Sequence, residues 1–469
     1  MSNPPSSACG NWPCRTMTTR LASSLRPSPD SSAAACPPSV AIHTQGCKLN
    51  QADSEALARR FALAGFRLVD SPASANVFVL NTCTVTAAAD AKARQALGAA
   101  RRANPRLLVV AAGCYAQRAA AELAAMEPVS LVVDNTRKEQ LVDLVLAKLG
   151  LSPAPSGQGN PESSSAFVPG FGGRTRAAIK IQEGCNQVCT YCIVPRVRGR
   201  ERSVHPDALV QQVAQRALEG VQEVVLTGTQ LGSYGFDISG ASLAALLRRI
   251  LKETAIPRLR VSSLQAQEIS PELLALWQDP RLCPHFHLPL QSGSDAVLAA
   301  IHRRYDTACY ARSVELIRRA IPGAGITADL IVGFPGESSP DFAETCRFIQ
   351  AMNFSDLHVF PYSARPGTAA ARLPGQVAAT VKAERKAQTL SLAQEGFAAF
   401  RRAQLGQSRP VLWELAMKRR GGNAVWSGLT DNYIRVYARS KELLGNTITQ
   451  AQLISLEGEQ MLAEPEGIS

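Results

Sequence analysis

Short apolar runs alternate with amphipathic helical segments over residues 39–150. VAIHT, VFVLN and RLLVVAA are typical of buried strands, and DSEALARRFALAGF and AAADAKARQALGAARRA are typical of the helices between them. In the first of these helices we expect Asp53 as the N-cap and Gly65 as the stop. Strands separated by helices predict a doubly wound parallel sheet, which makes this part of the chain an α/β domain.

The same rhythm returns after residues 151–174, a segment rich in Pro, Gly and Ser that predicts a linker. Six apolar runs follow with amphipathic segments between them, namely AAIKI, EVVLTG, RLRVSSL, HFHLPL, ADLIVG and DLHVFPY. A closed eightfold barrel usually needs about 250 residues. Residues 175–403 therefore predict an incomplete (β/α)6 barrel.

The pattern changes again at residue 404. RPVLWELA, NAVWSGLT, YIRVYAR and TITQAQLISL alternate apolar and polar positions between Gly and Asn turns, which predicts a small antiparallel β-barrel over residues 404–469. Residues 1–38 are rich in Ser, Pro and Ala without periodicity, and we expect a disordered extension there.

Charge and cysteine content narrow the class of protein. The formal net charge is +12, which favours a polyanionic partner such as nucleic acid. The sequence has no apolar run long enough for a bilayer and no secretory signal, so we expect a cytoplasmic protein. Its 12 cysteines are then expected to be reduced, and metal or cluster binding is favoured over disulfides.

Three cysteines follow the predicted strands of the first domain. Cys47, Cys83 and Cys114 stand in TQGC, NTC and AAGC, each just past the end of a strand. Parallel strands bring their carboxyl ends to one edge of a sheet. We therefore expect these three thiols to meet in one crevice, although three unrelated core cysteines would give the same pattern.

Three more cysteines follow the first barrel strand, where such barrels keep their active sites. Cys185, Cys189 and Cys192 lie in EGCNQVCTYCIVP with the spacing C-x3-C-x2-C. A structural zinc site would show paired C-x2-C knuckles and a fourth ligand, which this segment lacks. Three thiolates suit a cubane iron–sulfur cluster with one open iron, which a small molecule with an amine and a carboxylate could chelate.

The spacing of this loop resembles the radical S-adenosylmethionine (SAM) superfamily. The ordered series TQGCKLNQADSE, NTCTVTAAAD, AAGCYAQ, EGCNQVCTYCIVP, VLTGTQLGSYG, HLPLQSGSD and DLIVGFPGE resembles the methylthiotransferases, from Val40 to Glu464. Within that family, GCKLNQAD and LTDNYIRV are most similar to the branch that acts on N6-threonylcarbamoyladenosine in tRNA. The dimethylallyl-adenosine branch and the ribosomal-protein branch share the same layout.

The resemblance implies two 4Fe-4S clusters and SAM as cofactors. Cys185, Cys189 and Cys192 would hold the cluster that binds and cleaves SAM. Cys47, Cys83 and Cys114 would hold an auxiliary cluster that carries the sulfur. The implied reaction adds a methylthio group to C2 of N6-threonylcarbamoyladenosine next to the anticodon and uses two SAM. It needs a reducing electron donor such as a flavodoxin or ferredoxin, and the sequence does not identify the sulfur donor.

Residues after the other barrel strands stand where superfamily members contact SAM, although ordinary barrel-loop residues occupy the same places. For Asp329 a hydrogen bond inside the barrel is as good an explanation as a SAM contact, and His285 and His287 are expected to be packed interior residues. The full set of candidate SAM contacts is Thr227, Gly228, Ser262, Ser263, Gln291, Ser292, Asp329 and Gly333.

Basic and aromatic residues favour RNA as the polyanion. Four arginines follow the cysteine loop, and we expect them to contact phosphates of an anticodon loop unless they form a solvated face, namely Arg196, Arg198, Arg200 and Arg202. The C-terminal barrel resembles a TRAM domain, a module associated with RNA binding. We expect Trp426 and Tyr433 to be exposed, which fits that role, and they also fit a small barrel that packs its own core.

A protein of a different class remains as an alternative. A non-catalytic RNA-binding protein with structural zinc in its cysteine sites would share the basic charge and the six cysteines. That protein would be colourless and hold zinc, whereas a protein with two 4Fe-4S clusters would be brown. Metal content therefore separates the two classes.

Overall fold

The structure is a computed structural model and describes residues 37–152, 175–420 and 423–467. The expected N-terminal extension and most of the expected linker lie outside these residues. Within the described part of the chain, the helices are all too short or too polar to cross a membrane.

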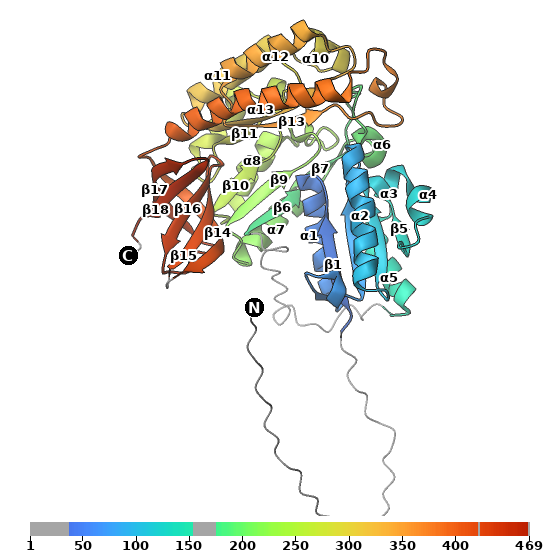
Figure 1. The fold of residues 1–469 in the computed structure, drawn as a ribbon. Coiled ribbons are helices and arrows are strands. Elements are labelled where there is room, and N and C mark those ends of the chain that lie inside the picture. The colour runs from blue at the N-terminus through green and yellow to red at the C-terminus, as the bar shows by residue number, and fades with distance from the viewer. Residues whose placement is uncertain (1–36, 153–174, 421–422, 468–469) are drawn as a thin grey trace, which may run out of the picture. The chain divides into compact units, whose positions relative to one another are not determined.

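The first domain is a five-stranded parallel sheet in the order β2-β1-β3-β4-β5. Helices α1 and α5 pack on one face of this sheet and α2 on the other, so the predicted doubly wound α/β architecture is confirmed (Figure 1). Its strands are β1 Ser39–Thr44, β2 Arg67–Leu68, β3 Val77–Thr82, β4 Leu108–Gly113 and β5 Leu131–Val133, and its helices are α1 Lys48–Leu63, α2 Ala87–Ala103, α3 Cys114–Arg118, α4 Ala120–Ala124 and α5 Leu141–Leu149.

The expected N-cap of the first helix is wrong. Helix α1 begins at Lys48, directly after Cys47, and places Asp53 inside the helix with its side chain buried. The end of the helix is as predicted, because the chain leaves α1 through Ala64 and Gly65, and Gly65 has a φ of 85°. Asp53 is thus free of any capping role and faces the second domain.

The second domain is the predicted incomplete six-stranded barrel. Two three-stranded parallel sheets, β10-β9-β6 and β11-β12-β13, are joined by bridges between Leu259 and Leu282 and between Ser263 and His287. The six predicted apolar runs form its strands, which are β6 Arg176–Lys180, β9 Glu223–Thr227, β10 Arg258–Val261, β11 His285–His287, β12 Gly325–Val332 and β13 Asp356–Pro361.

Helices cover the outside of this half barrel and bury one continuous apolar core against it. They are α7 Pro206–Leu218, α8 Leu243–Glu253, α9 Pro271–Leu274, α10 Asp295–Ile301, α11 Thr307–Ala320 and α12 Ser339–Met352. Helix α6 Val194–Arg198 and the ribbon of β7 Gln182–Glu183 with β8 Arg202–Ser203 flank the cysteine loop. Helix α13 Ala379–Arg402 leads to the last domain (Figure 1).

The C-terminal domain is a closed five-stranded barrel in the order β14-β15-β16-β18-β17, consistent with the expected TRAM-like domain. Trp426 is 6% exposed and packs in the core of this barrel, so its expected exposure is wrong and the alternative of a barrel packing its own core holds. The strands are β14 Ser408–Arg420, β15 Asn423–Thr430, β16 Arg435–Ser440, β17 Ile448–Glu457 and β18 Gln460–Pro465.

The turn between β15 and β16 docks on the half barrel. Arg260 donates to the carbonyl of Asp431 at 2.9 Å, and Asn432 donates to the carbonyl of Gly323 at 3.0 Å. A Cβ on Gly325 would lie 2.3 Å from the carbonyl oxygen of Asn432, so a side chain at this position would push the two domains apart. The two barrels therefore share a close backbone contact.

Candidate active site

The three strand-end cysteines of the first domain converge. Strands β1, β3 and β4 are neighbours in the parallel sheet, and Cys47, Cys83 and Cys114 follow their carboxyl ends. A Cβ on Gly46 would lie 2.6 Å from the Cβ of Cys83, and the φ of Gly46 is 95°. Glycine at this position therefore lets the Cys47 loop lie directly against Cys83.

The other two strand-end cysteines act on the charge state of the Cys83 thiol. Burial raises the pKa of the Cys83 thiol to about 11, the backbone amide of Val85 opposes this, and Cys47 and Cys114 add to the rise. The side-chain amide nitrogen of Asn135 lies 3.8 Å from the sulfur of Cys114. Without a metal the Cys83 thiol is therefore mostly protonated at neutral pH.

The cysteine loop of the half barrel begins right after β7. Cys185 donates its amide to the carbonyl of Gly199 at 3.1 Å, and a Cβ on Gly184 would lie 1.9 Å from the carbonyl oxygen of Arg200. Burial raises the pKa of Cys192 to about 12, and the nearby thiols of Cys189 and Cys185 add to this rise. The loop thus holds three thiols close together at the carboxyl end of the first barrel strand.

Arg303 is a site residue that the sequence analysis missed. Its guanidinium lies 3.6 Å from the sulfur of Cys189 and 4.9 Å from the ring centre of Tyr305. Arg303 stands in IHRRYD, just after α10. The motif HLPLQSGSD, which precedes it, is the sequence signal that could have identified this residue. A cation here offsets negative charge on any thiolate cluster in the loop.

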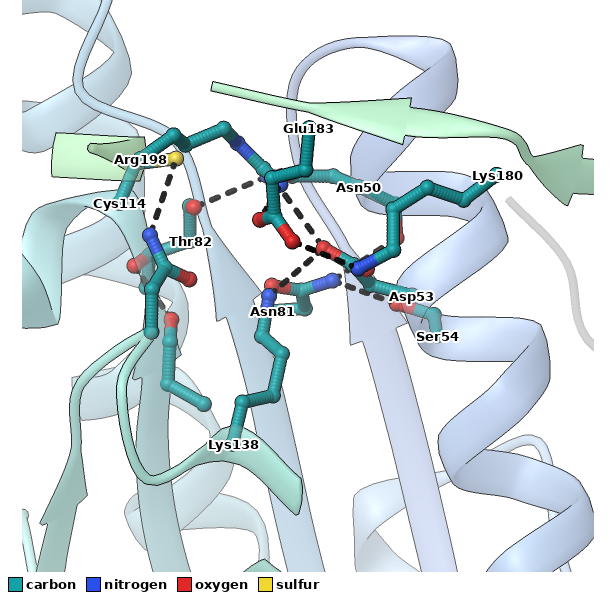
Figure 2. Close-up of polar contacts among 12 residues, drawn as sticks. Asn50, Asp53, Ser54, Asn81, Thr82, Cys114, Lys138, Lys180, Glu183 and Arg198 are labelled. Carbon is teal, nitrogen blue, oxygen red and sulfur yellow. Dashed lines mark hydrogen bonds and ion pairs between the residues drawn. The ribbon is translucent and has the colours of Figure 1, made fainter. Parts of the chain in front are cut away.

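A buried ionic network joins the two cysteine-bearing domains. Asp53 accepts from Lys138 at 2.8 Å, from Lys180 at 2.8 Å and from Arg198 at 3.1 Å (Figure 2). Burial would raise the pKa of Asp53, but these three cations hold it well below its usual range. Glu183, two residues before Cys185, accepts from the other side of Arg198 at 2.7 Å.

The predicted phosphate contact of Arg198 is contradicted by its position. Arg198 is 6% exposed, and its guanidinium donates to the side chains of Asp53, Glu183 and Asn50. Burial alone would lower the pKa of Arg198, but Cys114, Asp53 and Cys47 raise it above its usual value. Arg198 therefore places a permanent positive charge beside the strand-end cysteines.

A second arginine, Arg365, binds the first domain from the open edge of the half barrel. Arg365 donates to the hydroxyl of Thr84 at 2.8 Å and pairs with Asp90. Arg118 pairs with the same carboxylate at 2.9 Å. Since Thr84 follows Cys83 directly, this clasp fixes the second strand-end loop against the half barrel.

The predicted SAM-contact residues lie along the half barrel. Thr227 ends β9, Ser262 and Ser263 follow β10, and Gln291 and Ser292 follow β11. Gly333 follows β12 with a φ of 71°. These residues lie at the carboxyl end of the strands, as the cysteine loop does. Gly228 lies there too, and a Cβ on it would lie 3.1 Å from the carbonyl oxygen of Gln182. Direct contact with SAM stays a prediction for each of them.

Asp329 lies inside the barrel between two histidines. Its carboxylate is 3.2 Å from Nε2 of His287 and 3.3 Å from Nδ1 of His358, and Ser263 is 2.7 Å from Nδ1 of His287. Burial would raise the pKa of Asp329, but the two imidazoles hold it well below its usual range. The hydrogen bond inside the barrel, one of the two explanations given for Asp329, is thus present, and His285 is buried as expected.

The remaining arginines of the run are exposed. Arg196, Arg200 and Arg202 all face solvent, and Arg202 lies 4.0 Å from Glu183. They stand around the cysteine loop of the half barrel, where a polyanion can reach them. Their expected contact with RNA phosphates stays a prediction.

The donor sets fit iron–sulfur clusters. Each site offers three thiols and each has an arginine beside it, Arg198 or Arg303, which suits an anionic cluster that lacks a fourth protein ligand. An open six-stranded barrel with such a loop after its first strand defines the class of radical SAM enzymes. The strand-end cysteines of the first domain add a second site of the same kind.

Comparison with known proteins agrees with this class. Residues 39–134 match the model of the uncharacterized protein family UPF0004, and residues 179–349 match that of the radical SAM superfamily. A structure of the radical SAM methyltransferase TsrM from Kitasatospora setae, with cobalamin and a [4Fe-4S] cluster bound, has a TM-score of 0.50 at 14% identity. It covers 72% of this chain and 77% of its own. That likeness concerns the fold alone.

Curated relatives specify the family. The chain is 37% identical to threonylcarbamoyladenosine tRNA methylthiotransferase MtaB of Bacillus subtilis, over 88% of this chain and 93% of the relative. It is 41% identical to the MtaB protein of Aquifex aeolicus, over 74% and 85%. It is also 37% identical to the tRNA-2-methylthio-N(6)-dimethylallyladenosine synthase of Geobacter sulfurreducens, over 89% and 96%.

The chain belongs to the radical SAM methylthiotransferase family. It is therefore an enzyme whose cofactors are 4Fe-4S clusters and SAM.

Proposed function

We propose that this enzyme adds a methylthio group to C2 of N6-threonylcarbamoyladenosine next to the anticodon of tRNA. The observation that carries the proposal is the pairing of two three-thiol sites, one in each domain, around the shared network of Asp53, Glu183 and Arg198. Relatives of 34 to 41% identity that bear the name threonylcarbamoyladenosine tRNA methylthiotransferase support the choice of substrate.

Each three-thiol site has its own task in this proposal. Cys185, Cys189 and Cys192 would hold the cluster that binds SAM, and the strand-end cysteines, Cys47, Cys83 and Cys114, would hold the auxiliary cluster. When bound, the clusters would pass on electrons from the external donor and carry the sulfur, and the two SAM would supply the methyl group and the hydrogen-abstracting group. The protein supplies the cluster ligands and the charge compensation. Its thiols must lose protons to bind metal, and Arg198 and Arg303 compensate the negative charge that results.

The exposed arginines would hold the RNA over these sites. Arg196, Arg200 and Arg202 flank the loop of the SAM site, and phosphate contacts there would place an unstacked adenosine within reach of it. We propose the cytoplasm as the place of reaction because tRNA is modified there, and a flavodoxin or ferredoxin as the electron donor.

Mass spectrometry of tRNA nucleosides tests the proposal. We would express the chain in a bacterial strain that lacks the methylthio modification of threonylcarbamoyladenosine. We expect 2-methylthio-N6-threonylcarbamoyladenosine to appear in its tRNA. An unchanged profile would contradict the proposal, and a methylthio group found only on dimethylallyl-adenosine or on a ribosomal protein would assign the enzyme to one of those branches.

A further inference from the structure

A short segment after β13 contacts both cysteine sites. We call residues 362–373 of this segment the strap. Arg365 donates to the hydroxyl of Thr84, the residue after the second strand-end cysteine, at 2.8 Å. Five positions further along (370 minus 365), the amide of Ala370 donates to the carbonyl of Thr190, inside the loop of the SAM site, at 2.8 Å. The strap therefore joins a loop of the first domain to the cysteine loop of the half barrel.

A buried ion pair anchors the strap to the first domain. Arg365 is 3% exposed, and its guanidinium pairs with Asp90 in the first turn of α2. The hydroxyl of Ser363 also accepts from the amide of Ala87 at 3.1 Å. Arg118, which belongs to the first domain itself, pairs with the same carboxylate at 2.9 Å. Asp90 would thus keep a cation if Arg365 were replaced, so Arg365 is not needed merely to neutralise it.

Apolar packing anchors the other end of the strap to the SAM site. Ala370 is fully buried and lies in one apolar cluster with Phe334 and Tyr362. Cys189 and Tyr191 of the SAM-site loop pack against this cluster. Together with the hydrogen bond to the loop carbonyl, this packing fixes the strap against the backbone that carries the cysteines.

The link between the two anchors is a tight turn. Thr368 donates both its amide, at 3.1 Å, and its hydroxyl, at 2.8 Å, to the carbonyl of Arg365. Gly367 has a φ of 89°, a conformation that favours glycine. A Cβ on Gly367 would lie 3.3 Å from the guanidinium carbon of Arg196, so the turn also packs closely on α6. A displacement of one anchor is therefore passed on to the other with little slack.

The proposed reaction depends on how the two cysteine sites are placed relative to each other. Sulfur carried at the strand-end cysteines must reach the carbon that is activated at the SAM site, and the two sites lie in different domains. Asn135 joins the domains beside Cys114, since its side-chain amide donates to the carbonyl of Val197 at 2.7 Å. The strap supplies a corresponding joint beside Cys83. Displacing either site would slow sulfur transfer, because reacting groups must be closely aligned.

We propose that Arg365 is a positioning residue that fixes the strand-end site relative to the SAM site and thereby couples SAM cleavage to sulfur transfer. It acts through Thr84 and the strap and is not itself a catalytic residue. This inference rests on the proposed function and deepens it, because it names a side chain on which the yield of the second step depends.

The first test compares two products of the reconstituted holoenzyme. With an anticodon stem-loop that carries N6-threonylcarbamoyladenosine, we would measure 5′-deoxyadenosine and the methylthio product in the same samples. Because a displacement of about 1 Å can slow a step by about a hundredfold, Arg365→Met should raise the ratio of 5′-deoxyadenosine to methylthio product by about tenfold or more. Arg365→Lys keeps the charge without the forked guanidinium and should raise this ratio less. Both variants should keep the iron content of the unsubstituted enzyme.

The second test does not depend on activity. Hydrogen exchange of the holoenzyme, followed by mass spectrometry, reports on the amides of Ala87 and Ala370, which bond across the two anchors. Both amides should exchange faster in Arg365→Met. Ser363→Ala removes only the acceptor of Ala87, so it should raise the product ratio by a smaller factor and provides the test if Arg365→Met does not fold. Arg372→Met removes an exposed arginine of the same strap and is the matched control, with ratio and exchange unchanged.

The outcomes separate this inference from the function on which it rests. If the unsubstituted enzyme forms no methylthio product on this RNA, the proposed function is wrong and the inference falls with it. If that enzyme forms the product but Arg365→Met lowers both products in parallel, only the inference is overturned, since a general loss of active protein has that effect. Unchanged exchange at Ala87 and Ala370 in Arg365→Met, or an unchanged ratio in Ser363→Ala where Arg365→Met does not fold, would also overturn it.

Discussion

Arg198 and Arg200 show how differently two arginines of one charge run can act. Arg198 is buried between Asp53 and Glu183, whereas Arg200, two positions later, faces solvent. The sequence predicts the same role for both, because a run of alternating arginines does not reveal which one has acidic partners elsewhere in the chain. Arg198 finds its partner 145 positions away, at Asp53.

Arg198→Met should destabilise the protein, while Arg200→Met should not. Removing one partner of a buried ion pair costs about 3 to 5 kcal/mol in unfolding free energy, and a surface substitution stays within about 0.5 kcal/mol. Arg200→Met should instead weaken RNA binding and reduce its dependence on salt. Urea unfolding and RNA titrations at several salt concentrations measure both effects, and equal stability of the two variants would contradict the assignment.

At the scale of elements, the positions of the six cysteines follow from readable strand ends. The ends of β1, β3 and β4 are visible in the sequence because buried parallel strands are short apolar runs, and neighbouring parallel strands share an edge. The predicted start of α1 was wrong. Asp53 is a residue type that often caps helices, and the apolar pattern does not show that only three residues connect β1 to α1. Arg303 lies just after a helix, and Arg365 and Asn135 lie in the segments after β13 and β5. They were missed because their polar partners are far away in the sequence, which hydrophobic periodicity does not reveal.

Cysteine substitutions in the two loops should have separable effects. Cys185→Ala should abolish SAM cleavage, whereas Cys47→Ala should leave the formation of 5′-deoxyadenosine intact and stop sulfur transfer, because the two cysteines belong to different three-thiol sites. Iron should fall from about eight atoms, four for each of two clusters, to about four in either variant.

Product analysis and iron determination after anaerobic purification check both effects. Equal loss of both activities in a folded protein would argue against two distinct clusters. Stoichiometric zinc in a colourless protein would favour the non-catalytic alternative.

At the scale of the whole molecule, ion pairs between residues far apart in sequence hold the two cysteine domains together. Asp53 meets Lys180 from 127 positions away, and Asp90 meets Arg365 from 275 positions away. Hydrophobic periodicity sets the fold of each domain, but it carries no information on which polar side chains face another domain. Domain architecture was therefore predictable and this interface was not.

The Asp53 network should make stability depend on acid. The pKa of Asp53 is lowered in the folded protein, so its contribution is complete above the usual pKa of about 3.9 and is lost as pH falls further. Asp53→Asn leaves three cations with an uncharged partner and should cost about 3 to 5 kcal/mol near neutral pH.

Urea unfolding of the metal-free protein and of this variant, from about pH 7 to about pH 3, tests the dependence. The difference in unfolding free energy should stay constant down to about pH 5 and narrow below about pH 4. A difference that grows on acidification would show that another group dominates.

The contact between the β15–β16 turn and the half barrel limits how the C-terminal domain can be deleted or exchanged. The carbonyl of Leu429 near the end of β15 accepts from Arg258, and the carbonyl of Asp431 in the turn accepts from Arg260. Tyr433 stacks on His285. Deleting this domain would remove the carbonyl acceptors of two buried guanidiniums, which would keep their ion pairs with Glu223, and would expose a histidine whose pKa is held low by burial. A truncated chain would thus be less active, and exchange of this domain between relatives requires the matching exchange of Arg258, Arg260 and His285 in the half barrel.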